Sequence, residues 1–257
     1  MKIYSWNVYY HSKTPEKQFE YIKNLDFDIL CLQEVPENLL KRFKTLPCNV
    51  VSAIDITFFS KKKEKTIYTA ILSRYPIRAS GAIPFPPIKL PVRALWVLKM
   101  RSGWIDYRYH GSLYADVDSG NGPVRVFSIH LTLSSPSNRY RELRIVEKFL
   151  PRKFCPILTG DFNIIDNSSM KMLGWLAGSP FSESVPWHRE RKHVEMLFKE
   201  WGLKNPLRKK VTHRFSHSQL DHILVPHDAK VVKAEVVKKT YTSDHHPVMV
   251  EVMLPSR

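Results

Sequence analysis

Short hydrophobic runs alternate with amphipathic segments from the first residues of the chain onward. Residues 15–24 carry apolar side chains at helical spacing and begin with Pro15, a residue type that favours the first position of a helix. Mostly apolar runs at 2–8 and 27–33 lie on either side and predict two strands. The sequence therefore begins as strand, helix and strand, and a short helix is expected at about 36–44.

The part of the chain between residues 49 and 132 is rich in strand-like runs. Within it, the stretch 83–91 contains four prolines and is predicted to be a loop, because proline has no N–H to donate in a central strand. The sequence DSGNG at 118–122 predicts a hairpin turn. The candidate strands are NVVSAIDITFFS (49–60), KTIYTAILS (65–73), RALWVLKM (93–100), GSLYADVD (111–118) and GPVRVFSIHL (122–131).

The rest of the chain contains both kinds of element. Several strands are apolar on both faces, which is typical of sheets that are covered on both sides. The pattern predicts a single domain over residues 1–257, of the mixed α/β or α+β class, with two β-sheets packed face to face and helices outside them. Helical segments are expected at 136–150, 168–178 and 189–201, and strands at 154–161, 220–225, 230–237 and 246–253.

Composition and charge narrow the classes of protein. Hydrophobic residues make up 43% of the chain, which excludes a disordered protein and allows a sizeable core. Lys and Arg total 40 against 24 Asp and Glu, so the formal net charge is +16 at pH 7. Such a charge attracts polyanions, which predicts a nucleic acid as the partner and leaves an anionic membrane surface as the alternative.

The cysteines and the N-terminus indicate the compartment. Cys31, Cys48 and Cys155 show neither a metal-binding spacing nor the pattern of a disulfide framework. The N-terminus lacks the long apolar region of a signal peptide, and no run of about 20 apolar residues predicts a transmembrane segment. We therefore expect a soluble, cytoplasmic protein.

Polar residues recur where the hydrophobic runs begin or end. Any one of them has a simple structural explanation, since Asn and Asp are common in turns and a lone histidine is often a hydrogen-bonded core residue. Their recurrence through the entire chain is harder to explain in that way, and it predicts a shared polar site. The residues are Asn7, Glu34, His130, Asp161, Asn163, Asp221, Asp244 and His245.

Six motifs containing these residues carry a resemblance to a known family. They are SWN (5–7), QE (33–34), IHL (129–131), GDFN (160–163), LDHI (220–223) and SDHHP (243–247). In this order they resemble the endonuclease/exonuclease/phosphatase superfamily, and above all its deoxyribonuclease I-like and tyrosyl-DNA phosphodiesterase-like branch. The resemblance runs from residue 5 to about residue 252. It implies a four-layer α/β/β/α sandwich, in which two mostly antiparallel sheets are flanked by helices.

The resemblance also implies a divalent-metal-dependent phosphodiesterase. It makes Glu34 the principal ligand of Mg²⁺, with Asn7 beside it and Mn²⁺ as a substitute ion. Carboxylate oxygens are hard ligands that Mg²⁺ prefers, and the metal polarises the phosphate and stabilises the leaving oxygen. Tyr9 departs from the pattern of the abasic endonucleases, which commonly carry an aspartate there, and this argues against that assignment.

Two histidines and two aspartates complete the implied catalytic set. His130 and His245 allow an acid and a base on opposite sides of phosphorus, and the sequence leaves their order open. We expect Asp221 to fix the tautomer of His130. We expect Asp244 to orient His245 or to link it to the metal, although neighbouring residues on a strand point to opposite faces.

Further residues are expected to contact the substrate. Asp161 and Asn163 are two positions apart, so both face the cleft if the segment is extended; Asp161 would orient the attacking water and Asn163 would contact a phosphoryl oxygen. Arg139 follows the IHL motif, as in the deoxyribonuclease I-like branch. His213 and Arg214 precede LDHI, which places them next to a catalytic strand.

Three hypotheses for function remain at this stage. The first is a Mg²⁺-dependent DNA nuclease or DNA-repair phosphodiesterase. The second is a sphingomyelinase-like or inositol-phosphate-type phosphoesterase, whose apolar stretch 83–91 would touch a membrane. The third is a non-catalytic nucleic-acid-binding protein, which is disfavoured because every expected polar position is filled. Steep salt dependence of DNA binding would favour the first or the third.

Overall fold

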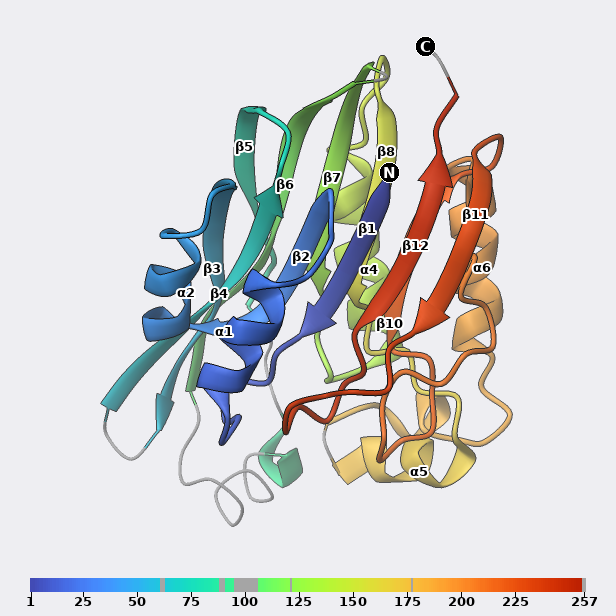
Figure 1. Cartoon of the computed structure of the whole chain (residues 1–257). Coiled ribbons are helices and arrows are strands. Elements are labelled where there is room, and N and C mark those ends of the chain that lie inside the picture. The colour runs from blue at the N-terminus through green and yellow to red at the C-terminus, as the bar shows by residue number, and fades with distance from the viewer. Residues whose placement is uncertain (61–62, 88–90, 95–105, 121, 177, 256–257) are drawn as a thin grey trace.

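The first strand pairs with elements from both ends of the sequence. In the computed structural model, β1 (Lys2–Asn7) is parallel to β2 (Ile29–Pro36) and antiparallel to β12 (Val248–Met253). The helix α1 (Pro15–Lys23) connects β1 to β2. Figure 1 shows the first and last strands side by side. The structure describes all residues except 61–62, 88–90, 95–105, 121, 177 and 256–257, and most of the predicted strand at 93–100 lies outside the described residues.

All but one of the described strands form one hydrogen-bonded path. The structure therefore confirms a mixed α/β fold, whereas a four-layer sandwich of two separate sheets stays a prediction, because β3 pairs with β6 and links the two halves of the path. The order is β11 (Lys230–Val236), β12, β1, β2, β4 (Lys63–Ser73), β3 (Asn49–Ser60), β6 (Asp106–Ser119), β7 (Gly122–His130), β8 (Cys155–Asp161), β10 (Asp221–Pro226) and β9 (Leu203–Lys204).

The two halves of this path pack against each other. One buried cluster joins Ile3, Cys31 and Ile71 of the first half to Val126 and Ile157 of the second half. These side chains alternate along their strands with residues that point the other way, so each half presents a second apolar face. The strands are therefore buried on both sides, as their unbroken hydrophobic runs predict.

Helices cover the two outer faces. On the first half, α1 and α2 (Glu37–Phe43) pack Phe19 and Phe43 against Leu30 and Leu32. On the second half, α4 (Pro136–Glu147) and α6 (Glu190–Glu200) form a cluster that includes Phe127 and Leu158. In Figure 1, α1 lies in front of the strands and α4 and α6 lie behind them. The helix α5 (Ser168–Leu176) and a short 3-10 helix (Phe181–Glu183) follow β8.

One strand differs from the sequence prediction. The strand β5 (Ile77–Pro84) pairs with β6, and its last two residues lie in the stretch that was expected to be a loop. Most residues of this segment are exposed. A weak hydrophobic pattern therefore hid an edge strand, and proline is tolerated at its end.

Buried polar side chains fix how the two halves sit on each other. The Nε2 of Gln33 donates to the Ser128 Oγ at 2.9 Å, and the Thr69 Oγ1 lies 2.8 Å from the same atom. All three residues are fully buried, so these hydrogen bonds are costly to break. They join β2, β4 and β7 through residues that lie next to Glu34 and two positions before His130 in the sequence.

Two further expectations from the sequence concern the cysteines and the length of the helices. The three cysteines are free thiols, in agreement with the sequence. Among the described helices, none has both the length and the apolar character needed to cross a bilayer.

We expect Gly160→Ala to destabilise the protein strongly. Gly160 has φ of +131°, and a Cβ there would lie 1.9 Å from the carbonyl oxygen of Ile129 on the paired strand β7. Strain and overpacking together should lower the free energy of unfolding by roughly 2–5 kcal/mol, as measured in urea. Gly120→Ala is the matched control, because a Cβ at Gly120 meets no atom within 4 Å; a comparable loss in both variants would contradict this explanation.

Candidate active site

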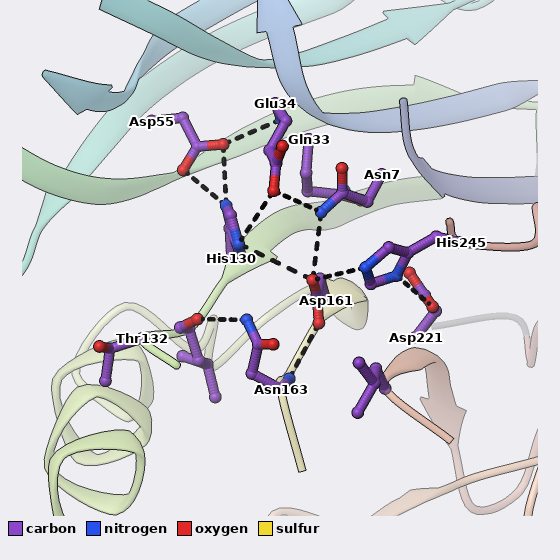
Figure 2. Close-up of polar contacts among 12 residues, drawn as sticks. Asn7, Gln33, Glu34, Asp55, His130, Thr132, Asp161, Asn163, Asp221 and His245 are labelled. Atoms are coloured by element: carbon purple, nitrogen blue, oxygen red, sulfur yellow. Dashed lines mark hydrogen bonds and ion pairs between the residues drawn. The ribbon is translucent and has the colours of Figure 1, made fainter. Parts of the chain in front are cut away.

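Strand register brings polar residues from distant parts of the sequence to one end of the strands. Asn7 lies opposite Gln33 in the parallel pair of β1 and β2, next to Glu34. On the other half, Asp161 pairs with His130 of β7 and with Asp221 of β10. Because the two halves face each other, both sets meet at a common site, which Figure 2 shows.

The amide of Asn7 links two carboxylates. Its Nδ2 donates to the Glu34 Oε1 at 3.0 Å and to the Asp161 Oδ2 at 3.2 Å. Its Oδ1 accepts a hydrogen bond from the backbone N–H of Tyr9 at 3.0 Å. Two carboxylate oxygens, one from each half of the strand path, therefore converge on a single point (Figure 2).

Glu34 is directed into the site by an irregular backbone. Its φ is +54°, and the register of β2 against β4 shifts between Leu32 and Val35, which is the signature of a β-bulge. Its own N–H donates to Asp55 at 3.0 Å. A non-glycine residue at positive φ costs free energy and is typical of functional sites. Although 16% of the side chain is exposed, burial raises the pKa of Glu34 above its ordinary value.

Two histidines face Asp161 from opposite sides, and each is backed by its own buried carboxylate. The Nδ1 of His130 is 3.0 Å from Asp55, and the Nδ1 of His245 is 2.9 Å from Asp221. These contacts fix Nδ1 as the protonated donor, so both Nε2 atoms point into the site. They lie 3.7 and 3.6 Å from the Asp161 Oδ2.

Opposite charges keep His130, His245 and Asp161 in their ionised forms. Burial alone would lower the pKa of His130, but the carboxylates around it, above all Asp55, outweigh burial and raise that pKa to about 10. His245 behaves in the same way, with Asp221 as the main cause and a pKa of about 10. Burial would raise the pKa of Asp161, but the two imidazoles outweigh it and lower that pKa below its usual range.

The donor set fits a divalent cation. The carboxylates of Glu34, Asp55, Asp161 and Asp221 and the two protonated imidazoles carry a formal excess of two negative charges. Burial raises the pKa of Glu34 and of Asp221 above their ordinary values, so a cation would stabilise the ionised forms. In place of its hydrogen bonds to both carboxylates and from Tyr9, a rotated Asn7 amide would add its oxygen to those of Glu34 and Asp161 when a cation binds. Several oxygen donors with a net negative charge are the environment that Mg²⁺ prefers.

Sequence comparison places this site in a known family. A sequence model of the Endonuclease/Exonuclease/phosphatase family matches residues 4–245, which is nearly the whole chain. The chain belongs to this family. Endonucleases, exonucleases and phosphatases all hydrolyse phosphoester bonds, so the members of this family are hydrolases of that class. No curated protein matches the sequence.

Solved structures of the family share the fold. An endonuclease/exonuclease/phosphatase from Beutenbergia cavernae has a TM-score of 0.71 at 16% identity, with 99% of this chain and 71% of that chain covered. The 3′ phosphatase NExo from Neisseria, bound to a product DNA hairpin, has a TM-score of 0.62 at 22% identity, covering 99% and 100%. A humanised TDP2 from D. rerio has a TM-score of 0.64 at 17% identity, covering 99% of each chain. At these identities the likeness shows the fold alone.

The carboxylates that contact His130 and His245 are not the ones that the sequence predicted. Asp221 was expected to fix the tautomer of His130, but it binds His245 instead. Asp244 was expected to orient His245 or to link it to the metal; its Oδ2 lies 3.5 Å from the Nε2 of His213, and it acts on His245 through its charge, which helps to raise the pKa of that imidazole. The reason is the register of the strands, which places Asp221 opposite Asp161 and on the His245 side of the site.

Asp55 is the functional candidate that sequence reasoning missed. It is fully buried and contacts His130 and the backbone of Glu34, so it connects both halves of the site. It lies in the middle of the hydrophobic strand β3, at a register shift between Ile54 and Ile56. A charged residue in the middle of an apolar strand was the available signal.

Arg191 is a second residue that the sequence did not single out. Its guanidinium contacts Asp166 at 2.7 Å and the Gln219 carbonyl oxygen at 2.7 Å, which ties the loop after β8 to the start of β10. It also lies 3.2 Å from the Nε2 of His222. Burial, reinforced by Arg191, lowers the pKa of His222 to about 3, so the neutral ring accepts this hydrogen bond. Arg191 therefore positions the strand that carries Asp221.

The predicted substrate contacts are distributed unevenly. Asn163 is buried at the site with φ of +52°; its Nδ2 donates to the Leu131 carbonyl oxygen at 2.8 Å and has a second hydrogen to offer. Arg214 is exposed. It lies beside the site, because its N–H donates to the Asp244 carbonyl oxygen. Arg139 is 3% exposed and forms two hydrogen bonds with Glu190, so the structure gives no support to its role in substrate contact.

A second group of possible metal ligands lies at the edge of the site. The ligand atoms of His213, Asp244 and His245 lie within 4.8 Å of one another. The N–H of Ser216 donates to the Nδ1 of His213 at 3.1 Å, so the proton of the neutral ring lies on Nε2, which faces Asp244. In this tautomer the Nε2 of His213 has no lone pair to offer a metal ion, and its proton faces Asp244.

We expect Asp55→Asn to lower the pKa of His130, because it removes the main charge that raises that pKa to about 10. The measurement is a pH titration of the imidazole by NMR in the presence of a chelator, with His245 as the internal control. In the wild type, the folded pKa lies above the unfolded value of about 6.5, so the ion pair stabilises the protein fully below pH 6.5 and is lost as the pH rises through 10. An unchanged titration of His130 would contradict the assignment.

Proposed function

We propose that this protein is a divalent-metal-dependent phosphodiesterase that acts on nucleic acid, with DNA as the leading substrate and Mg²⁺ as the ion. The observation that carries the proposal is the position of Asp161 between two carboxylate-backed imidazoles and beside Asn7 and Glu34. This arrangement holds an ionised acceptor and two proton donors around one point, as phosphodiester hydrolysis requires.

The ionisation of the site assigns a role to each group. Asp161 has a lowered pKa, so it is a carboxylate before the reaction; it accepts a hydrogen bond from the attacking water, orients it and takes up its proton as the new P–O bond forms. His130 and His245 have raised pKa values, so they carry protons on Nε2. One imidazole donates to a phosphoryl oxygen and the other protonates the departing oxygen. Glu34 and Asn7 would hold Mg²⁺, which supplies charge neutralisation at the phosphate.

The charge of the molecule supports a polyanionic substrate. The site itself has an excess of negative charge, yet the whole chain has a net charge of +16. The positive charge therefore lies outside the site, where it attracts phosphates and raises the rate of encounter. Arg214 is one exposed cation beside the site. The DNA-bound structure of the fold relative NExo is consistent with this choice of substrate.

We expect Glu34→Gln to lower the metal-dependent turnover number by at least about 100-fold, because the loss of several kcal/mol of transition-state stabilisation has that effect. Hydrolysis is measured with Mg²⁺, with Mn²⁺ and with a chelator. The substrates are plasmid, single-stranded DNA, abasic duplex, 5′-tyrosyl DNA, RNA and sphingomyelin. Glu200→Gln is the control, since Glu200 is exposed at the end of α6.

DNA binding by the same variant separates the hypotheses. A nuclease should keep its DNA affinity in Glu34→Gln while it loses turnover. Activity confined to sphingomyelin would contradict the nucleic-acid substrate and favour a lipid phosphoesterase. DNA binding by the wild type without turnover of any substrate would contradict the enzyme and favour a binding protein.

A further inference from the structure

Three aromatic rings form a ladder beside the site. The rings of Phe58 and Tyr10 meet edge to face with centroids 5.4 Å apart, and the Tyr10 and His11 rings lie 3.9 Å apart at an angle of 36°. Tyr9 lies beside this ladder of Phe58, Tyr10 and His11, with its ring 5.8 Å from that of His11. The ladder joins the loop after β1 to the hairpin of β3 and β4.

The backbone attaches this ladder to the expected metal ligands. The N–H of Tyr10 donates to the Glu34 Oε2 at 3.3 Å, and the N–H of Tyr9 donates to the Asn7 Oδ1. Tyr9 has φ of +59°, a strained conformation that the surrounding contacts maintain. His11 follows Tyr10 directly, and its ring packs against that of Tyr10, whose backbone is hydrogen-bonded to Glu34.

The ladder is buried at one end and exposed at the other. Phe58 is 4% exposed and packs with Ile67, and Tyr10 is partly buried against this small cluster. His11, at the far end of the ladder, is exposed. Core packing explains the positions of Phe58 and Tyr10, but it does not require a ring at His11.

A cation accompanies the exposed end. Lys65 lies opposite Phe58 in the antiparallel pair of β3 and β4, so both side chains point to the same face of the sheet. Burial, and then the charge of Lys65, lower the pKa of His11, which favours the neutral form of its imidazole. A neutral ring next to a lysine offers a stacking surface and a phosphate contact together.

We propose that His11 is the stacking platform for an unpaired nucleobase next to the scissile phosphate, and that Lys65 contacts the neighbouring phosphate. The inference rests on the proposed function and names its substrate more closely: a strand whose base is unstacked at the cut. Base stacking on an aromatic side chain tolerates any sequence, because every base has a π-face. The platform therefore selects for exposed bases without selecting their identity.

The test compares the same bond with and without a base beside it. A single-stranded oligonucleotide is cut next to one defined nucleotide, and a second oligonucleotide carries a tetrahydrofuran abasic residue at that position. For the wild type, we expect kcat/KM at the adjacent bond to fall by about 5-fold to 100-fold when the base is absent. In His11→Leu the ratio should approach one, whereas His11→Phe should retain the wild-type ratio.

Controls separate this inference from folding and from the proposed function. His227→Leu makes the same exchange at an exposed histidine after β10 and should keep the wild-type ratio; urea unfolding checks that all variants are folded. Equal ratios in the wild type and His11→Leu would overturn the platform while leaving the nuclease intact. Failure of the wild type to cut any oligonucleotide, together with hydrolysis of another phosphoester, would overturn the nuclease and the platform with it.

Discussion

The excess of buried negative charge at one end of the strands is the constraint on which the rest depends. Isolated carboxylates cannot remain ionised in a dry interior without compensation. Here Asp55 and Asp221 are compensated by His130 and His245, and Asp161 lies between the two imidazoles. These pairs fix the protonated nitrogens, and the carboxylate of Glu34 brings the formal residual charge to −2, which a divalent cation matches. Charge balance thus couples the metal ligands to the acid–base groups.

The fold serves this constraint by fixing distances between segments that are far apart in sequence. A bulge in β2 turns Glu34 into the site, and Gln33 beside it is hydrogen-bonded across the core to Ser128. On the other half, Arg191 ties the loop after β8 to β10, which keeps Asp221 opposite His245. Strain at Glu34 is maintained by these surroundings, since positive φ is unfavourable for such a residue.

The sequence predicted which residues form the site better than it predicted which of them contact one another. Residues such as Asn7 and Glu34 end hydrophobic runs, so their convergence could be inferred from strand periodicity and from the motifs. The contact between His130 and Asp55 could not be inferred in this way, because Asp55 lies in the middle of β3, at a register shift, and not at the end of a hydrophobic run. Arg139 shows the opposite limit: an arginine after a motif looks available for a phosphate, but a buried partner on α6, Glu190, engages it.

Anomalous diffraction from crystals soaked in Mn²⁺ tests the central claim most directly, because it locates the cation without depending on any substrate. Charge balance predicts one strong peak within coordination distance of the Glu34 carboxylate and close to Asn7 and Asp161. In Glu34→Gln crystals that peak should weaken or vanish. A wild-type peak held only by His213, Asp244 and His245, or none near Glu34 in crystals of active enzyme, would contradict the account.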